Sequence, residues 1–510
     1  MAFDWRLNAI QTAARKFRKL YFSFCKNVLL VLAIIFILTL SEPLIFAQSF
    51  KEQYEQFKKN AQISYSSFRY ECNQRYIKFL AEAWDWYEGK APIPMPKDES
   101  PVPPKPYIGE NDIPHIDTKP TEIDPIEITP QPKPIEPIKE IPTHDEDYFT
   151  LKFYDQECKI RLSEFAKLTL DDCLPNTIAS GWESLCNEGM NNAIRDCLET
   201  RIRYNLCDWA YLMFLDQLAQ QYCDNSNSAT LLTAFLYCQS GYQMRLAVDG
   251  AKLLLLYGSK HQIFDKGYFN VDGIYFYSLG EPSNSIRICG AAFEGETPMS
   301  LLIEKEQLLG DKLSEERVIT ATRNKDISMI SQVPQSLIEF YNTYPTSDLD
   351  GNPMTRWAMY ANTSLAQKTK DKIYPSLRQY TDGKDKLQAA EMLLNLIQTG
   401  FVYEYDDKVW GHDRAFFAEE TLFYPFCDCE DRSILFSRLI RDLLSLDVAL
   451  IYYPGHLATA VCFDQEVSGD TMIIGGRKFI VCDPTYIGAP VGAQMPDLEY
   501  DKAQAIILKK

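Results

Sequence analysis

Apolar and polar residues follow two different periods in the last third of the chain. Over residues 433–444, apolar positions recur every three or four residues, which predicts a helix with one buried stripe. The runs 448–453, 457–463 and 479–482 are short and apolar, which predicts buried strands. A Pro-Gly pair at 454–455 turns the chain between the first two runs. The pattern therefore predicts a helix followed by strands in an α+β fold.

The middle of the chain mixes both patterns. From residue 146 onward the sequence is mainly helical and rich in cysteine, and residues 271–329 carry alternating runs typical of strands. Helical patterns resume near Ser336, and residues 387–401 predict the helix that leads into the C-terminal segment. We therefore expect a helical and β region over 146–345 and a C-terminal domain over 346–510.

The N-terminus has the pattern of an export signal. Six basic residues precede an uncharged apolar run of thirteen residues, 28–40. This length is short for a bilayer span and typical of a signal-peptide core. We expect residues 1–47 to be a signal peptide ending at Ala47, or alternatively an uncleaved membrane anchor. In both cases the rest of the chain is exported, to the periplasm or the cell envelope.

Two segments separate this signal from the globular regions. Aromatic residues recur at spacings of three and four between residues 48 and 90, which predicts a long amphipathic helix. Residues 91–145 contain fifteen of the 28 prolines, interleaved with charged residues. Such a segment cannot bury a core, so we expect a disordered, extended tether.

Composition narrows the functional classes. The chain has 510 residues and 46% hydrophobic residues, enough for two or three domains with cores of their own. The net charge of −18 argues against nucleic-acid binding, because phosphates require basic patches. The same charge offers no support for binding to anionic membranes.

Three residues in the C-terminal segment suggest chemistry. Cys429 precedes the helix predicted over 433–444, where the positive end of a helix dipole favours a thiolate nucleophile. His456 begins the second strand run and Asp483 ends the third, so neighbouring strands could bring them together. His456 would then act as the base, and Asp483 would orient its ring.

Residues 384–490 resemble the transglutaminase-like superfamily, which shares the papain-like cysteine peptidase fold. The resemblance rests on the Asp-Cys-Glu-Asp turn around Cys429, the Gly-His-Leu string around His456, and the Asp-Pro-Thr-Tyr string that starts at Asp483. It implies that Cys429 is the nucleophile, His456 the base and Asp483 the orienting residue. It implies no metal and no organic cofactor.

The oxyanion site is less defined. The backbone N–H of Cys429 is the expected first donor. The family often adds an upstream side-chain donor, and Trp410 and Gln398 are the candidates here. The polar and aromatic segment 403–414 is expected to shape the groove. His412 is a rival base within it, ranked below His456 because it lies in loop-like sequence.

The cysteines allow other interpretations. Cys427 and Cys429 could be disulfide partners, and together with His456, Cys462 and Cys482 they could instead bind zinc. The C-x-C spacing is too close for a zinc knuckle, which makes zinc the weaker alternative. Thirteen cysteines remain after a cleaved leader, so one thiol is unpaired, and Cys429 is the natural candidate. The other twelve could form up to six bridges or be reduced core residues.

The sequence also suggests a second, degenerate copy of the module. Residues 224–229 align with 428–433 at an offset of 204, and residues 274–279 align with 478–483 at the same offset. An apolar helical pattern follows the first string in both places. The alternative is that two unrelated α/β segments are alike by chance, and the sequence leaves both interpretations open.

In this alignment the first copy lacks the residues that would carry chemistry. Asn225 replaces the nucleophile and Leu279 replaces the aspartate, while His261 matches His456 only across a gap. An amide cannot act as a thiolate does, so this copy is expected to be inactive.

These observations favour an exported enzyme that transfers an acyl group from an amide bond of a protein or peptide substrate through a thioester on Cys429. With water as acceptor it is a peptidase or amidase, and with an amine it is a transglutaminase. The alternative is a catalytically inactive transglutaminase-like binding or scaffold module of the cell envelope. That module would be anchored through its N-terminus and would bind an envelope protein.

Overall fold

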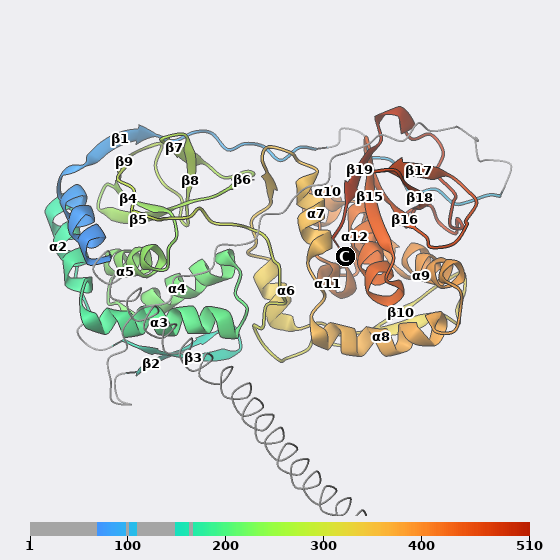
Figure 1. Ribbon diagram of the computed structural model, residues 1–510, viewed down its shortest axis with the longest axis horizontal. Coiled ribbons are helices and arrows are strands. Elements are labelled where there is room, and N and C mark those ends of the chain that lie inside the picture. Colours follow the sequence, from blue (N-terminus) through green and yellow to red (C-terminus); the bar gives the residue numbers. More distant parts are fainter. Residues whose placement is uncertain (1–68, 98–100, 110–147, 163–166, 510) are drawn as a thin grey trace, which may run out of the picture. The chain divides into compact units, whose positions relative to one another are not determined.

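The structure is a computed structural model in which the chain divides into two compact units, Met1–Glu71 and Cys72–Lys510. The description below concerns the second unit (Figure 1). The predicted signal or anchor over 1–47 lies outside the described residues. Among the described residues, no helix has both the length and the apolar character needed to cross a membrane. The structure describes residues 69–97, 101–109, 148–162 and 167–509.

The fold is mixed α and β, as the sequence predicts, and contains two large antiparallel sheets. The six-stranded sheet has the order β1 (Trp84–Glu88), β9 (Ser285–Cys289), β4 (Met244–Asp249), β5 (Lys252–Gly258), β8 (Ile274–Ser278), β7 (Tyr268–Val271). The five-stranded sheet has the order β17 (Thr471–Ile474), β18 (Arg477–Cys482), β16 (His456–Cys462), β15 (Asp447–Tyr453), β19 (Gln504–Ile507).

Four helices lie beside the first sheet (Figure 1). They are α2 (Pro175–Leu185), α3 (Glu188–Arg203), α4 (Asp208–Tyr222) and α5 (Ser226–Gln239). Helix α5 packs against β5 and β4, and it is buried on nearly all sides, as its largely apolar sequence requires. The hairpin β2 (Tyr148–Phe153) and β3 (Gln156–Arg161) packs against α3 and α4.

The next four helices follow the first sheet in the chain. The helices are α6 (Gln335–Tyr341), α7 (Thr355–Asn362), α8 (Gln367–Thr381) and α9 (Lys386–Gly400). Two small antiparallel pairs also form, β6 (His261–Ile263) with β12 (Ser347–Leu349), and β10 (Arg317–Thr320) with β11 (Ser328–Ser331). The helix predicted over 387–401 is confirmed as α9.

The C-terminal region is built around one buried helix, α12 (Cys429–Leu439), which a π-turn at Ile440–Leu444 extends. Every residue of α12 is buried, because the helix packs against β15 and β16 and also contacts other helices. The predicted strands are confirmed as β15, β16 and β18. The remaining elements here are β13 (Val402–Tyr403), α10 (Asp406–Val409), α11 (Ala418–Phe423) and β14 (Phe426–Cys427).

The two sheets repeat one arrangement. The first contains the order β9-β4-β5-β8-β7, and the second has the order β19-β15-β16-β18-β17, with neighbouring strands antiparallel in both. In each, a buried helix precedes a hairpin with a two-residue turn and packs against both strands of that hairpin. The strand that follows the second hairpin returns in both cases to the first strand. Of the strands in these two sheets, only β1 has no counterpart.

Two predictions about the region before the first sheet are wrong in part. The helix expected over 48–90 does not continue to its end, because residues 84–88 form β1 and pair with β9. Aromatic residues suit a strand as well as a helix, and pairing with β9 decides between them. The expected disorder of 91–145 does not hold for 91–97 and 101–109, which are extended and hydrogen bonded to the rest of the unit.

The cysteines do not form bridges among the residues described. None of those thirteen cysteines is in a disulfide, and most of them are buried. Within this part of the chain the reduced-core interpretation is therefore confirmed over the disulfide one. Free cysteine behaves as a small apolar side chain in a core.

A buried guanidinium joins the elements around α12. Arg432 is 1% exposed, and its Nη2 donates to the Phe401 carbonyl at 2.9 Å. Its Nη1 donates to the Gln398 carbonyl at 3.2 Å and faces the Pro484 carbonyl at 3.5 Å. The guanidinium carbon also lies 5.3 Å from the centre of the Tyr403 ring. One side chain therefore connects α12 to the end of α9 and to the loop after β18.

We expect Arg432→Met to lower the free energy of unfolding by about 3 kcal/mol, because it removes charged hydrogen bonds and leaves buried carbonyls without a donor. Urea unfolding followed by circular dichroism measures this loss. Arg477→Met is the matched control, since Arg477 pairs with Asp447 at the surface, and we expect it to cost less than about 1 kcal/mol. Equal losses in the two variants would contradict the joining role of Arg432.

Candidate functional site

The first turn of α12 holds the predicted nucleophile. Cys429 is its first residue, and Asp428 is the N-cap. The side chain of Asp428 accepts from the Asp431 backbone N–H, and the Asp431 carboxylate accepts from the Asp428 N–H at 3.2 Å. This reciprocal capping box begins the helix at Cys429, four residues before the apolar pattern that predicts it.

The predicted base and orienting residue form a hydrogen-bonded pair. His456 opens β16 and Asp483 directly follows β18, and these strands are neighbours in the sheet. His456 Nε2 lies 2.9 Å from Asp483 Oδ2. The other oxygen of Asp483 accepts from the backbone N–H groups of Thr485 and Tyr486. The carboxylate is therefore fixed, and it holds the imidazole in one orientation.

The second ring nitrogen of His456 has no partner. Nδ1 is buried and makes no hydrogen bond in the part of the chain that the structure describes. His456 lines the same pocket as Cys429. The pocket encloses about 680 Å³, including space open to solvent, and α7, the segment 403–407, the first turn of α12 and the β15–β16 hairpin form its walls. The unpartnered nitrogen therefore belongs to a residue that faces the thiol's own pocket.

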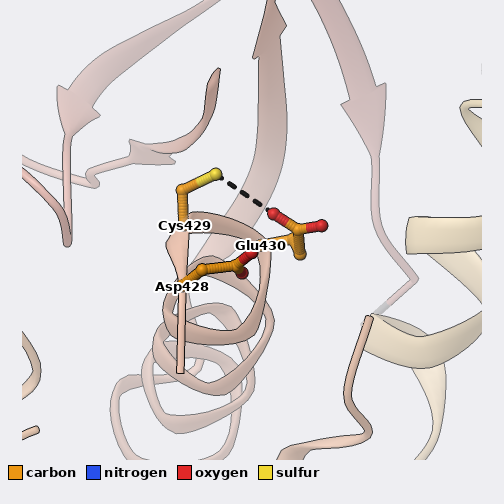
Figure 2. A group of neighbouring side chains, drawn as sticks. All are labelled: Asp428, Cys429 and Glu430. Atoms are coloured by element: carbon orange, nitrogen blue, oxygen red, sulfur yellow. Dashed lines mark hydrogen bonds between the residues drawn. The ribbon is translucent and has the colours of Figure 1, made fainter. Parts of the chain in front are cut away.

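The thiol itself is held by a carboxylate. Cys429 Sγ donates to Glu430 Oε2 at 3.1 Å, as Figure 2 shows. No hydrogen bond joins Cys429 to His456 among the residues described. Burial raises the pKa of the Cys429 thiol well above its usual range, and the charges of Glu430 and Asp428 raise it further. The Leu457 backbone N–H opposes this increase.

The expectation that the helix N-terminus favours a thiolate is therefore not met in this arrangement. The dipole of α12 acts over its first turn only, and three acidic residues occupy the same turn. The burial of the sulfur and the negative charges of Glu430 and Asp428 outweigh the dipole. Cys429 rests as a protonated thiol.

Further carboxylates surround the thiol. Burial raises the pKa of Asp406, Asp428 and Asp431, and mutual repulsion with neighbouring acids adds to the effect. One oxygen of Asp428 is buried without a hydrogen-bond partner. Carboxylate oxygens are the ligands that hard cations prefer. The groups whose ligand atoms lie close enough to hold a cation are Asp428–Cys429–Glu430, Asp406–Asp413–Glu430 and Asp406–Asp428–Asp431.

The predicted oxyanion donors lie elsewhere. Both N–H groups of the Gln398 amide are used, since Nε2 donates to the Asp483 carbonyl at 3.0 Å and the Ala489 carbonyl at 3.1 Å. Its oxygen accepts from the Gly488 N–H at 3.0 Å. Gln398 therefore shapes the loop that carries Asp483, and it has no donor left for an oxyanion. The candidate is wrong because a buried amide must satisfy its own hydrogen bonds first.

Trp410 and His412 also lie outside the pocket wall. The Trp410 ring packs against Tyr424 and beneath the Arg414 guanidinium. His412 is exposed, with Nδ1 3.0 Å from the Trp410 carbonyl. His456 is thus the histidine that shares the pocket with Cys429, which agrees with its ranking above His412.

The zinc alternative finds no support among the described residues. Cys427 Sγ contacts the Val402 carbonyl, and Cys482 Sγ contacts the Ile480 carbonyl. Cys462 contacts Arg477 at the surface. These sulfurs do not gather with His456 in any group that could hold a metal.

Sequence reasoning identified one wall of the pocket and missed others. The segment 403–414 was expected to shape the groove, and Tyr403, Tyr405 and Asp406 do line it. Arg356 and Trp357 of α7 line it as well, about seventy residues before Cys429 in the chain. No local motif marks them. Only the packing of α7 against α12 brings them to the site.

The equivalent positions in the first sheet differ from those expected. Asn225 is the N-cap of α5, and its side chain accepts from the Ser228 N–H. Asn227, not Asn225, makes the contact that corresponds to the one between the Cys429 sulfur and the Leu457 N–H. Its Oδ1 accepts from the Leu253 N–H at 2.9 Å. Leu253 is the second residue of β5, and Leu457 is the second residue of β16. Lys252 opens β5 where His456 opens β16, so the match to His261 is wrong.

The end of the third strand differs too. Leu279 directly follows β8, as Asp483 follows β18, and the next residue is Gly280. Neither carries a carboxylate. The first sheet therefore lacks a thiol, an imidazole and a carboxylate at the places that correspond to the C-terminal site.

Comparisons with known proteins add nothing to this geometry. No family model matches the chain, and neither the curated proteins nor the solved structures contain a significant match.

We expect Glu430→Gln to lower the pKa of Cys429, because it removes the charge that lies closest to the sulfur. More thiolate is then present at a given pH, so the rate of Cys429 alkylation rises at pH 7.5 by about threefold or more, which is half a pKa unit. Iodoacetamide labelling at several pH values, with the modified residue mapped by mass spectrometry, measures the shift. Asp407→Asn is the control, since Asp407 lines the same pocket but is largely exposed. A rate that does not change in Glu430→Gln contradicts the assignment.

Proposed function

We propose that the chain is a cysteine-dependent acyl-transfer enzyme that acts on amide bonds of a protein or peptide substrate. One observation carries the proposal. His456 is fixed by Asp483 through Nε2, its Nδ1 has no partner, and it shares a pocket with Cys429. A buried imidazole with one oriented and one unpartnered nitrogen is the arrangement that a general base next to a nucleophile requires.

The reaction begins when Cys429 gives its proton to His456 Nδ1. The sulfur then attacks the amide carbonyl carbon, and the C–S bond forms as the carbonyl becomes an oxyanion. Collapse of this intermediate breaks the C–N bond, and the imidazolium returns its proton to the leaving amine. Water or a second amine, deprotonated by His456, then attacks the thioester, and the thiol is released.

Backbone donors stabilise the oxyanion in this proposal. The N–H groups of the first turn of a helix have no acceptor within the helix, and Cys429 is the first residue of α12. Its N–H is therefore the donor we assign. Neither Gln398 nor Trp410 is assigned this role.

The thiol must leave Glu430 before it reacts. A rotation about the Cα–Cβ bond of Cys429 exchanges one staggered position of the sulfur for another. Such a rotation would break the contact with Glu430 and turn the sulfur toward His456. The hydrogen bond to Glu430 therefore stabilises the resting position of the sulfur. Substrate that enters the pocket must compete with this hydrogen bond.

The proposed fold is a papain-like, transglutaminase-like core preceded by a degenerate copy of itself. The common strand order of the two sheets and the equivalent placement of α5 and α12 support the duplication. Asn227 bonds to the second residue of β5 as Cys429 does to that of β16, and Lys252 opens β5 as His456 opens β16. The first copy would then serve as a scaffold or binding module, and the second would carry the chemistry.

The second candidate function is a binding or scaffold module without catalysis. The contact of Cys429 with Glu430 rather than with His456 favours it. In either case we propose that the chain is exported and associated with the envelope, because residues 1–47 have the pattern of a signal or anchor.

We expect Cys429 in the full-length chain to be alkylated by iodoacetamide, and the rate to fall roughly tenfold or more in His456→Ala, because the base that takes the thiol proton is lost. Asp483→Asn should also slow the reaction, since the ring loses its orientation. His412→Ala is the matched control and should leave the rate unchanged. Mass spectrometry of the labelled chain identifies the modified cysteine.

A second measurement tests acyl transfer itself. The chain is incubated with a tryptic peptide mixture and quenched in acid, and an acyl adduct on Cys429 that hydroxylamine removes is the expected thioester. Labelling of Cys429 that does not depend on His456, together with no adduct, would favour the binding module.

A further inference from the structure

An extended segment of the chain starts at the pocket wall with Pro101 and continues to the loop that follows β18. We name residues 101–109 the strap. The Val102 N–H donates to the Gly455 carbonyl at 2.9 Å, and Pro101 lines the pocket itself. Gly455 directly precedes His456, so the strap is hydrogen bonded to the turn that carries the proposed base.

The other end of the strap binds the loop of the orienting residue. The Tyr107 N–H donates to the Ile487 carbonyl at 3.0 Å, and the Ile487 N–H donates to the Lys105 carbonyl at 2.8 Å. The Tyr107 ring packs edge-on against Tyr486 at 5.5 Å. This loop begins at Asp483. The strap is therefore bound by both segments that position the imidazole.

Recognition of the strap is mainly through its backbone. The three hydrogen bonds use main-chain atoms of Val102, Lys105 and Tyr107, and none needs an N–H from the strap's four prolines. Prolines are compatible with recognition through the backbone. They keep the chain extended, and the N–H groups that they lack are not needed for these three hydrogen bonds. The surface that holds the strap, formed by Gly455 and the loop at Tyr486 and Ile487, thus binds an extended peptide through its backbone, and we call this surface the groove.

Side chains add two preferences. Val102 and Tyr107 are half-buried against the core on the outer face of the second sheet. Lys105 pairs with Asp497 at 2.8 Å, and Lys97, just before the strap, lies 3.9 Å from Asp407. An apolar residue, an aromatic residue and lysines thus face complementary surface.

We propose that the strap occupies the groove in which the peptide substrate binds, so that the chain is autoinhibited and its substrate is an extended, proline-containing, lysine-bearing peptide. The word substrate in this inference rests on the proposed function. The binding of an extended peptide in the groove rests on the contacts of the strap alone. A substrate peptide of this class must displace the strap, or the strap must be cut, before the peptide can bind in the groove.

The test uses the full-length chain with two proline substitutions. Val102→Pro removes the N–H that bonds to Gly455, while Ile108→Pro makes the same change at a strap position that is 77% exposed. We expect Val102→Pro to raise the rate of Cys429 labelling by N-ethylmaleimide about fivefold or more, and Ile108→Pro to leave it unchanged. Tyr107→Ala is a second variant with the same expected direction. Thermal unfolding confirms that each variant is folded.

Binding of a peptide tests the groove directly. The probe is a fluorescein-labelled peptide with the sequence of residues 101–109, and anisotropy measures its binding to Val102→Pro and to the unchanged chain. We expect saturable binding to Val102→Pro, weaker binding to the unchanged chain, and weaker binding of a peptide in which Tyr107 is alanine.

The outcomes separate the strap from the proposed chemistry. Unchanged labelling in both Val102→Pro and Tyr107→Ala, with no peptide binding, overturns the inference even where labelling depends on His456. Peptide binding that blocks labelling of Cys429 supports it. A labelling rate that is the same in His456→Ala counts against the acyl-transfer function. In that case the peptide-binding measurement alone tests whether the groove binds an extended peptide.

Discussion

The C-terminal site depends on one buried positive charge. The Arg432 guanidinium binds backbone carbonyls at the end of α9 and in the loop that follows β18, while its own helix carries Cys429. A charge in this position is stable only while those carbonyls surround it, and they are positioned only while the charge is present. Gln398 adds a second connection, because it donates to the carbonyls of Asp483 and Ala489. The positions of α12, of the loop after β18 and of the His456 imidazole therefore depend on one another.

The opposite sign of charge governs the resting state. Acidic residues occupy the first turn of α12, and Asp406 and Asp413 add to them from the facing segment. Burial raises the pKa values of Asp406, Asp428 and Asp431, and burial of the sulfur likewise disfavours a thiolate among them. The site thus keeps its thiol protonated while it keeps its imidazole oriented. In the proposed function, a substrate that enters the pocket would have to change that balance.

Sequence patterns were sufficient for the elements that repeat a simple period, and for the residues that open or end them. The helix at 433–444 and the strands that begin at His456 and end before Asp483 all follow from local spacing. The pairing of His456 with Asp483 follows from the neighbouring strands. The contact of Cys429 with Glu430 does not follow from local spacing, because it depends on a side-chain rotamer and on the burial of the carboxylate. Similarly, a strand partner that is two hundred residues away in the chain makes residues 84–88 a strand.

The attachment of the strap to the chain has a consequence for how it would be displaced. Because the strap is covalently joined to the protein that it contacts, its effective concentration at the groove is set by the length of the connection and not by the amount of protein. For short connections this value is in the range of about millimolar. Residues 91–97 shorten the connection further, since Ile93 is itself bridged to Phe264. A free peptide with the same contacts would need a concentration of that order to compete. Dilution of the protein would not release the strap, whereas cuts in the chain on both sides of it would.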